Sequence, residues 1–127
     1  MLLAFSVAPS GRPTRPTDGP SADDVPAGSA AIPADEASVH DAVAEAVRIV
    51  RESGLPNHTD SMFTTIEGEW DEVFAVVKRA TEAVGRYGSR ISLVIKADIR
   101  PGFAGELTGK LDRLEQALGN PSDPAAR

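Results

Sequence analysis

The sequence predicts an α+β domain with the element order β-α-β-β-α-β, followed by one more helix. Three observations carry this prediction. Some stretches alternate between apolar and polar side chains, which indicates strands, and others carry apolar residues at helical spacing. Glycine or proline separates the stretches. With right-handed crossovers, this order gives a ferredoxin-like sandwich, with strands ordered 4-1-3-2 and two helices on one face.

The first predicted strand, residues 2–8, places Leu3, Phe5 and Val7 on one face. Its other face is also mostly apolar, which is typical of a central strand. Ser6 is the polar exception on that second face. Its hydroxyl is expected either to bond to nearby backbone or to face a ligand.

Residues 9–35 contain six prolines and three glycines, and no strand or helix period runs through them. Such a segment cannot bury enough apolar surface to offset its ordering entropy, so we expect a mobile loop. Residues 120–127 are predicted to form a disordered tail. The predicted folded unit is therefore a single domain over residues 1–119.

The first helix is predicted to begin at Ser38, with Asp41 three residues on as in a capping box, and to end before Gly54. A short polar strand at residues 55–60 is expected at a sheet edge. The apolar face of the helix is made of Val39, Val43, Ala46, Val47 and Val50.

The next stretch runs from a strand at residues 62–66 into a helix. Thr64, Thr65 and Glu67 stand at the end of the strand, and Trp70 opens the helix. A strand end that opens into a helix is a common place for a polar site. The same residues also fit a well-capped junction, and Trp70 can either stack on a ligand or pack against the sheet.

The remaining elements follow from equally regular patterns. The second helix, residues 69–84, has acids in its opening turn and bases later, as the helix dipole favours. Residues 90–100 alternate as a strand with one core face and one polar face. The third helix, residues 105–118, carries a narrow leucine stripe: Leu107, Leu111, Leu114 and Leu118.

The predicted arrangement leaves one sheet face without helices. A partner subunit, the third helix or a ligand must cover it. If the first and third strands run parallel, as we expect, Thr65 and Glu67 lie at the same end of that face as Ser6, and Ser92 joins them from the last strand. A one-residue slip of the third strand would substitute Thr64 and Ile66.

Composition narrows the function classes. A net charge of −6 argues against a general nucleic-acid binder. The absence of cysteine excludes disulfides and thiolate sites, and His40 and His58 suggest no third metal ligand by spacing. No apolar run is long enough to span a membrane, so a cytoplasmic protein is expected. No nucleophile–base pair is evident, and we predict no catalytic residues and no metal.

Four segments together resemble the bacterial and archaeal thiamine-binding protein family with YkoF-like, ferredoxin-like domains. They are residues 3–9 (LAFSVAP), 47–55 (VRIVRESGL), 62–70 (MFTTIEGEW) and 92–96 (SLVIK). The Thr-x-x-Glu-Gly element from Thr64 to Gly68 is the most specific part. The resemblance covers most of the chain outside residues 9–35 and the tail. The long proline-rich segment is a departure from the family pattern.

The resemblance implies a non-catalytic protein that binds thiamine or its hydroxymethylpyrimidine moiety in salvage or transport, as a homodimer or homotetramer. Hydroxyls can serve an aminopyrimidine as donors or acceptors, and a carboxylate favours the thiazolium cation. The expected ligand-binding residues are Ser6, Thr64, Thr65, Glu67, Ser92 and Trp70. Two other hypotheses remain: an oligomerisation module without a ligand and, ranked lowest, an enzyme.

Overall fold

The computed structural model describes residues 1–12 and 34–119, with the backbone alone for residues 34–38. Its elements follow the predicted order, with one short 3-10 helix, η2, added before the last strand. They are β1 (Leu2–Ser10), α1 (Ala34–Glu52), β2 (Asn57–Thr59), β3 (Thr64–Glu67), α2 (Trp70–Val84), η2 (Gly85–Tyr87), β4 (Arg90–Asp98) and α3 (Glu106–Leu118).

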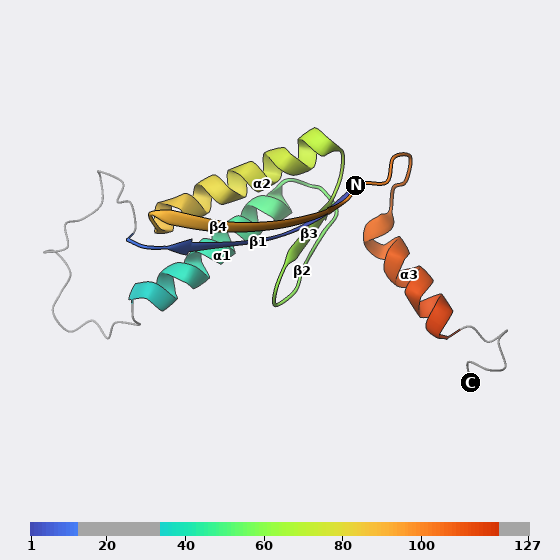
Figure 1. Ribbon diagram of the computed structural model, residues 1–127, viewed down its shortest axis with the longest axis horizontal. Coiled ribbons are helices and arrows are strands. Elements are labelled where there is room, and N and C mark those ends of the chain that lie inside the picture. Colours follow the sequence, from blue (N-terminus) through green and yellow to red (C-terminus); the bar gives the residue numbers. More distant parts are fainter. Residues whose placement is uncertain (13–33, 120–127) are drawn as a thin grey trace, which may run out of the picture.

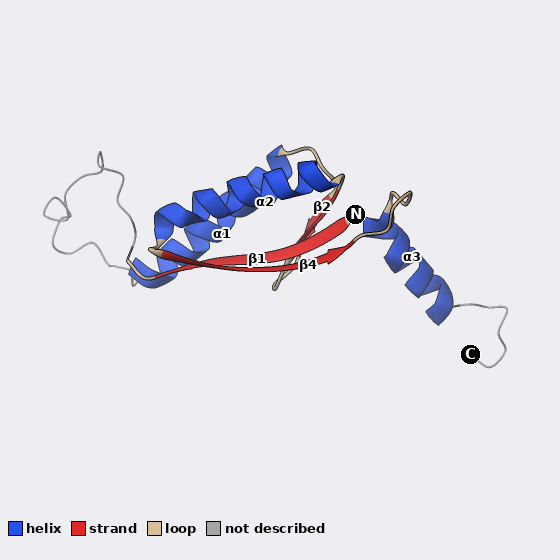
Figure 2. Cartoon of the chain, turned by 45° about the horizontal axis from the view of Figure 1, so that its top comes forward, coloured by secondary structure: helices blue, strands red, loops and turns tan. Residues whose placement is uncertain are grey.

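The four strands form one sheet in the order β2-β3-β1-β4, and α1 and α2 cover one of its faces (Figures 1 and 2). This is the 4-1-3-2 order, and it confirms the ferredoxin-like sandwich with an additional C-terminal helix. The longest pairing joins β1 and β4 over nine residue pairs, from Leu2 opposite Asp98 to Ser10 opposite Arg90.

The predicted parallel pairing of β1 and β3 is wrong: the two strands are antiparallel, with Phe5 opposite Thr64 and Leu2 opposite Glu67. The crossover through α1 makes β1 and β2 run in the same direction. β3 returns from β2 through a tight turn and inserts between β2 and β1, so it must run against both. The end of β3 therefore lies beside the start of β1.

Apolar side chains from the sheet and the two helices meet in one core. Leu3 and Ile66 point from the sheet, Val50 from α1, and Val73 and Val84 from α2, and all five are fully buried. These residues fall on the predicted apolar faces of β1, α1, β3 and α2. The predicted core face of residues 90–100 is not buried: in β4 only Ile91 is even half-buried, because none of the described helices covers this edge of the sheet. Val76, buried on α2, extends the predicted stripe.

Several predicted boundaries shift. The second and third strands each begin two residues later than predicted, at Asn57 and Thr64, and β4 ends at Asp98 rather than at residue 100. β1 continues to Ser10 because β4 supplies partners for every residue of it, including Pro9. α1 begins at Ala34 rather than at Ser38. The predicted loop 9–35 thus overlaps a strand and a helix at its ends. Its remainder, residues 13–33, and the tail at 120–127 lie outside the described residues.

α3 leaves the sandwich at one end of the sheet (Figure 1). Gly102 and Gly105, with φ of 82° and 73°, allow the chain to turn sharply before it, in the left-handed region that favours glycine. The buried Glu67 carboxylate accepts the backbone N–H of Glu106 through Oε2 at 2.6 Å. Beyond this anchor, the predicted leucine stripe stays exposed at Leu111, Leu114 and Leu118.

Candidate ligand-binding site

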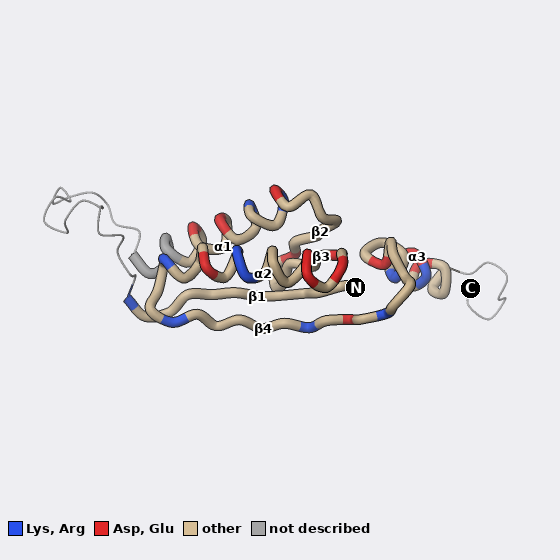
Figure 3. The backbone as a smooth tube through the Cα atoms, turned by 90° about the horizontal axis from the view of Figure 1, so that it is seen from above, with Lys and Arg blue, Asp and Glu red and all other residues tan. Residues whose placement is uncertain are grey.

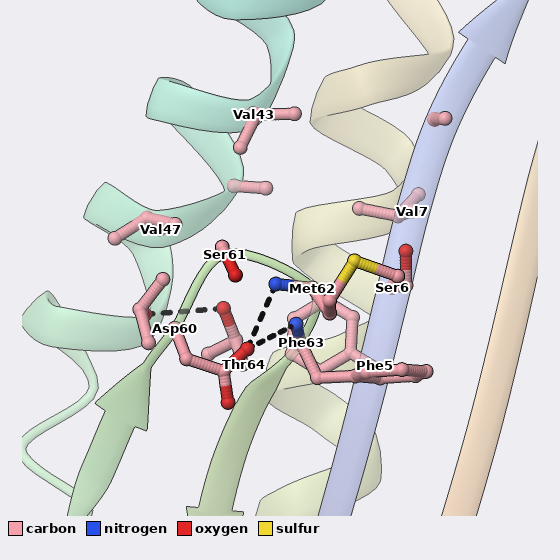
Figure 4. Close-up of a pocket in the computed structure, with 13 residues that line it drawn as sticks. Phe5, Ser6, Val7, Val43, Val47, Asp60, Ser61, Met62, Phe63 and Thr64 are labelled. Carbon is pink, nitrogen blue, oxygen red and sulfur yellow. Dashed lines mark hydrogen bonds between the residues drawn. The ribbon is translucent and has the colours of Figure 1, made fainter.

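A cleft of about 210 Å³ opens where β3 stops pairing with β1. The pairing begins at Thr64 opposite Phe5, so the later residues of β1 have no strand beside them on that side. The turn between β2 and β3 and one face of α1 enclose this gap (Figure 4). The short hairpin thus creates the cleft by leaving part of a central strand uncovered.

The cleft has an apolar interior and a more polar, exposed rim. Phe5 and Val7 of β1 and Ala46 of α1 are buried, whereas Ser61 and Met62 in the turn are exposed. Figure 4 shows the labelled side chains converging from β1, α1 and the turn. The full lining is Phe5, Ser6, Val7, Ala8, Val43, Ala46, Val47, Thr59, Asp60, Ser61, Met62, Phe63 and Thr64.

Two hydroxyls lie together on neighbouring strands that line the cleft, on the same sheet face as Phe5. Ser6 also lines the cleft, but its side chain alternates to the other face. Thr59 Oγ1 and Thr64 Oγ1 lie 3.1 Å apart, and either can be the donor. A hydroxyl has one donor hydrogen and two acceptor sites, so this pair keeps capacity for a ligand. The Ser6 hydroxyl makes no hydrogen bond to any residue that the structure describes.

Asp60 shapes the rim. Its Oδ1 accepts the backbone N–H groups of Met62 and Phe63 at 2.8 and 2.9 Å, closing a turn that carries Phe63 into the lining. These two hydrogen bonds, helped by nearby His58, hold the pKa of Asp60 below its usual value, so the carboxylate is ionised at neutral pH. Its Oδ2 accepts no hydrogen bond from the described residues.

The structure brings two of the predicted site residues together and separates the others. Ser6 and Thr64 both line the cleft. Thr65 lies on the other sheet face, between Ala4 and His58 in register. Glu67 also lies on that face, as predicted, but opposite Leu2; that is four residues along β1 from Ser6, or about 13 Å at strand spacing. Its carboxylate is committed to α3.

Ser92 and Trp70 also lie apart from the cleft lining. Ser92 pairs with Ala8, so it comes to the Ser6 end of the sheet as predicted, but it is exposed on β4. Trp70 is 53% exposed and lies against Phe74, with ring centroids 4.9 Å apart. It borders a separate cleft of about 170 Å³ whose wall includes Phe103.

Sequence reasoning gave Asp60 and Ser61 no part in a site. The run Asp60-Ser61-Met62-Phe63 stands between two strands that have threonine at their facing ends. This pattern could have indicated the rim of the site. When one oxygen of an aspartate accepts the N–H groups of a turn, its second oxygen stays available to the structure beside the hairpin. In this fold α1 and the free edge of β1 lie beside the hairpin. Their position there depends on the order and direction of the strands.

The fold places the protein in the class of ferredoxin-like α+β domains with an additional C-terminal helix. A solved structure of a domain of unknown function from Bacillus cereus matches with a TM-score of 0.58 and 26% identity, over 84% of this chain and 83% of that one. A candidate thiamine biosynthesis/salvage protein from Thermotoga maritima matches with a TM-score of 0.58 and 18% identity, over 88% and 97%.

The chain belongs to the thiamine-binding protein family, whose family model matches residues 27–115. Among its relatives is the UPF0045 protein Mb1933 of Mycobacterium bovis, which is 54% identical over 84 residues, or 65% of this chain and 82% of the relative. A UPF0045 protein of Synechocystis, sll0230, is 36% identical over 84 residues, covering 65% and 69%.

Proposed function

We propose that the protein binds thiamine, or its hydroxymethylpyrimidine moiety, in the cleft beside β1, as a non-catalytic step in vitamin salvage or transport. The observation that supports the proposal is an apolar slot lined by the paired hydroxyls of Thr59 and Thr64. Membership of a family described as thiamine-binding supports the choice of ligand.

The size of the cleft favours the pyrimidine half as the buried part. Pockets that enclose drug-sized ligands measure about 300–1,000 Å³. The present cleft, at about 210 Å³, is smaller. An aminopyrimidine ring fits this volume better than the whole vitamin, so the thiazolium would lie at the open rim.

The ring and the lining match in chemistry. The walls from Phe5, Phe63 and Val47 offer apolar contact to both faces of a flat ring. An aminopyrimidine carries an amino donor and ring-nitrogen acceptors, and hydroxyls can satisfy either kind of group. Thr59 and Thr64 stand opposite one another on adjacent strands and can engage one ring edge together.

Calorimetric titration with thiamine and with hydroxymethylpyrimidine tests the proposal. Thr64→Val should weaken binding of both about fivefold, because one hydrogen bond is worth about 1 kcal/mol and 1.4 kcal/mol is tenfold.

Thr65→Val is the matched control, since it removes the same hydroxyl one residue away on the opposite sheet face. It should leave both affinities unchanged. Absence of binding by the wild-type protein at millimolar ligand would refute the proposed function. Equal losses at Thr64 and Thr65 would refute this cleft as its place.

A second candidate role is self-association, which the exposed apolar edge of the sheet supports. β4 is an edge strand, and Leu93, Val94 and Ile95 are exposed on it. A long apolar edge is a template for pairing with another strand. Figure 3 shows few charges along it.

A two-fold axis at Val94 would place Arg90 of one copy opposite Asp98 of the other, a self-complementary register. We therefore propose that the protein is a homodimer or homotetramer. Light scattering on the eluting protein tests this, and a monomer at micromolar concentration would contradict it.

None of the helices that the structure describes is long and apolar enough to cross a membrane. A cytoplasmic location, in keeping with a salvage role, stays a prediction that fractionation of the producing cells can check.

A further inference from the structure

The charge of the residues that line the cleft indicates which form of the ligand the cleft accepts. Asp60 is the one charged side chain among the described residues that line it, and no lysine or arginine is present in that lining. Proteins that hold phosphate groups supply basic side chains or converging backbone N–H groups to them. The described part of this site has a carboxylate where such groups would be needed.

The position of Asp60 decides which part of a ligand meets the charge. Thr64, Phe5 and Val7 form the buried part of the cleft, whereas Asp60, Ser61 and Met62 are exposed at its rim. A pyrimidine seated in the buried part leaves the thiazolium, and the hydroxyethyl arm attached to it, at the rim. The thiazolium carries the positive charge, and the arm is where thiamine is phosphorylated.

We propose that the Asp60 carboxylate makes this cleft selective for the unphosphorylated, cationic form of thiamine and unfavourable to its phosphate esters. The inference rests on the proposed function and adds a specificity-determining residue to it. A monophosphate ester adds about −1.5 to −2 of charge at neutral pH, next to a carboxylate that is already ionised, and the diphosphate is more negative still. The attraction of the thiazolium is offset by this repulsion.

The hydrogen bonds of Asp60 explain why it can serve in this way. Oδ1 is held by the N–H groups of Met62 and Phe63, which fixes the carboxylate in place, and Oδ2 is left without a described partner. A fixed carboxylate loses little conformational freedom when it meets a cation. Nearby His58 is exposed and lowers the pKa of Asp60, so it also favours the ionised form.

The test compares four probes by calorimetric titration of the full chain: hydroxymethylpyrimidine, thiamine, thiamine monophosphate and thiamine diphosphate. The wild-type protein should bind thiamine at least about fivefold more tightly than thiamine diphosphate at low salt, a modest factor because the rim is exposed. Raising the salt from about 0.02 M to about 0.5 M should shrink this ratio, since salt screens exposed charges.

Asp60→Asn is the decisive variant. Its amide oxygen can still accept the two turn N–H groups, so the fold of the turn is kept while the charge is removed. The thiamine-to-diphosphate ratio should fall to about one, and hydroxymethylpyrimidine affinity should stay unchanged. Glu82→Gln, on the exposed face of α2 outside the cleft, changes the net charge equally and should leave the ratio as in wild type.

The outcomes separate the two proposals. Equal affinity of the wild-type protein for thiamine and thiamine diphosphate would overturn the charge selection while leaving the proposed function in place. A ratio that persists in Asp60→Asn, or that changes equally in Glu82→Gln, would overturn the role of Asp60. Failure of all four probes to bind would overturn the proposed function and this inference together.

Discussion

Thr64 and Thr65 are neighbours in the sequence, but their side chains lie on opposite faces of the sheet. Thr64 is buried beside Phe5 on the helix-covered face, and Thr65 lies beside Ala4 on the other face. Residue type alone made both candidates for the same site. Because side chains alternate along a strand, two consecutive residues point to opposite faces of the sheet.

Ile66, fully buried at the centre of β3, offers a residue-scale test of the core. Ile66→Val should lower the free energy of unfolding by about 0.5–1.5 kcal/mol, the usual cost of removing one buried methylene. Urea titration measures this loss. Ile99→Val, at a position that is 53% exposed, should change it by less than about 0.5 kcal/mol. Equal effects at the two positions would contradict the assigned core.

At the scale of elements, Glu67 joins β3 to α3. Its Oε2 accepts the Glu106 N–H at the start of the helix, where a negative charge is also favoured by the helix dipole. The same helix makes two ion pairs: Lys110 with Asp98 of β4, and Arg113 with Glu106 within α3. The pKa of Glu106 is lowered by its bond to Arg113, so this pair is intact at neutral pH.

Glu67→Ala should therefore loosen α3 without touching the cleft. We expect a loss of about 1–3 kcal/mol in unfolding free energy, because a buried N–H is left unpaired. Hydrogen exchange should rise over residues 107–118, while thiamine affinity stays within twofold of wild type. Glu82→Ala, at an exposed position on α2, is the control and should change neither. A large loss of thiamine affinity in Glu67→Ala would place the ligand at the other end of the sheet.

At the scale of the whole molecule, apolar surface remains that one chain does not cover. The free edge of β4 and the leucines of α3 are exposed together with Ile99 and Phe103. Monomeric proteins rarely leave contiguous apolar patches of this kind open to water. The sheet face opposite α1 and α2 is likewise free of helices over most of its length (Figure 2).

Val94→Lys tests whether this edge joins two copies. A two-fold axis at Val94 would bring the two lysines face to face, and like charges directly opposite one another are destabilising. The variant should elute and scatter light as a smaller species than wild type. Ala75→Lys, on the exposed side of α2, should keep the wild-type mass. An unchanged mass in Val94→Lys would move the interface away from β4.

The sequence by itself determined the elements, their order and the buried sides of β1, α1 and α2. Valine and leucine spacing in α2 and β1 is a local pattern, and it reads correctly because each residue's face depends only on the period of its own element. The ferredoxin-like strand order also followed, since crossover handedness leaves few alternatives.

Tertiary structure alone decided which residues meet. The direction of β3 against β1 sends Glu67 to α3 and Thr64 to the cleft, and the short length of β3 leaves Ser6 beside an opening. β1 and β3 pair residues that are about sixty positions apart in the sequence. Because the two strands are antiparallel, the start of one lies beside the end of the other. That is why Asp60, which has an ordinary turn pattern in the sequence, lies at the rim of the candidate site.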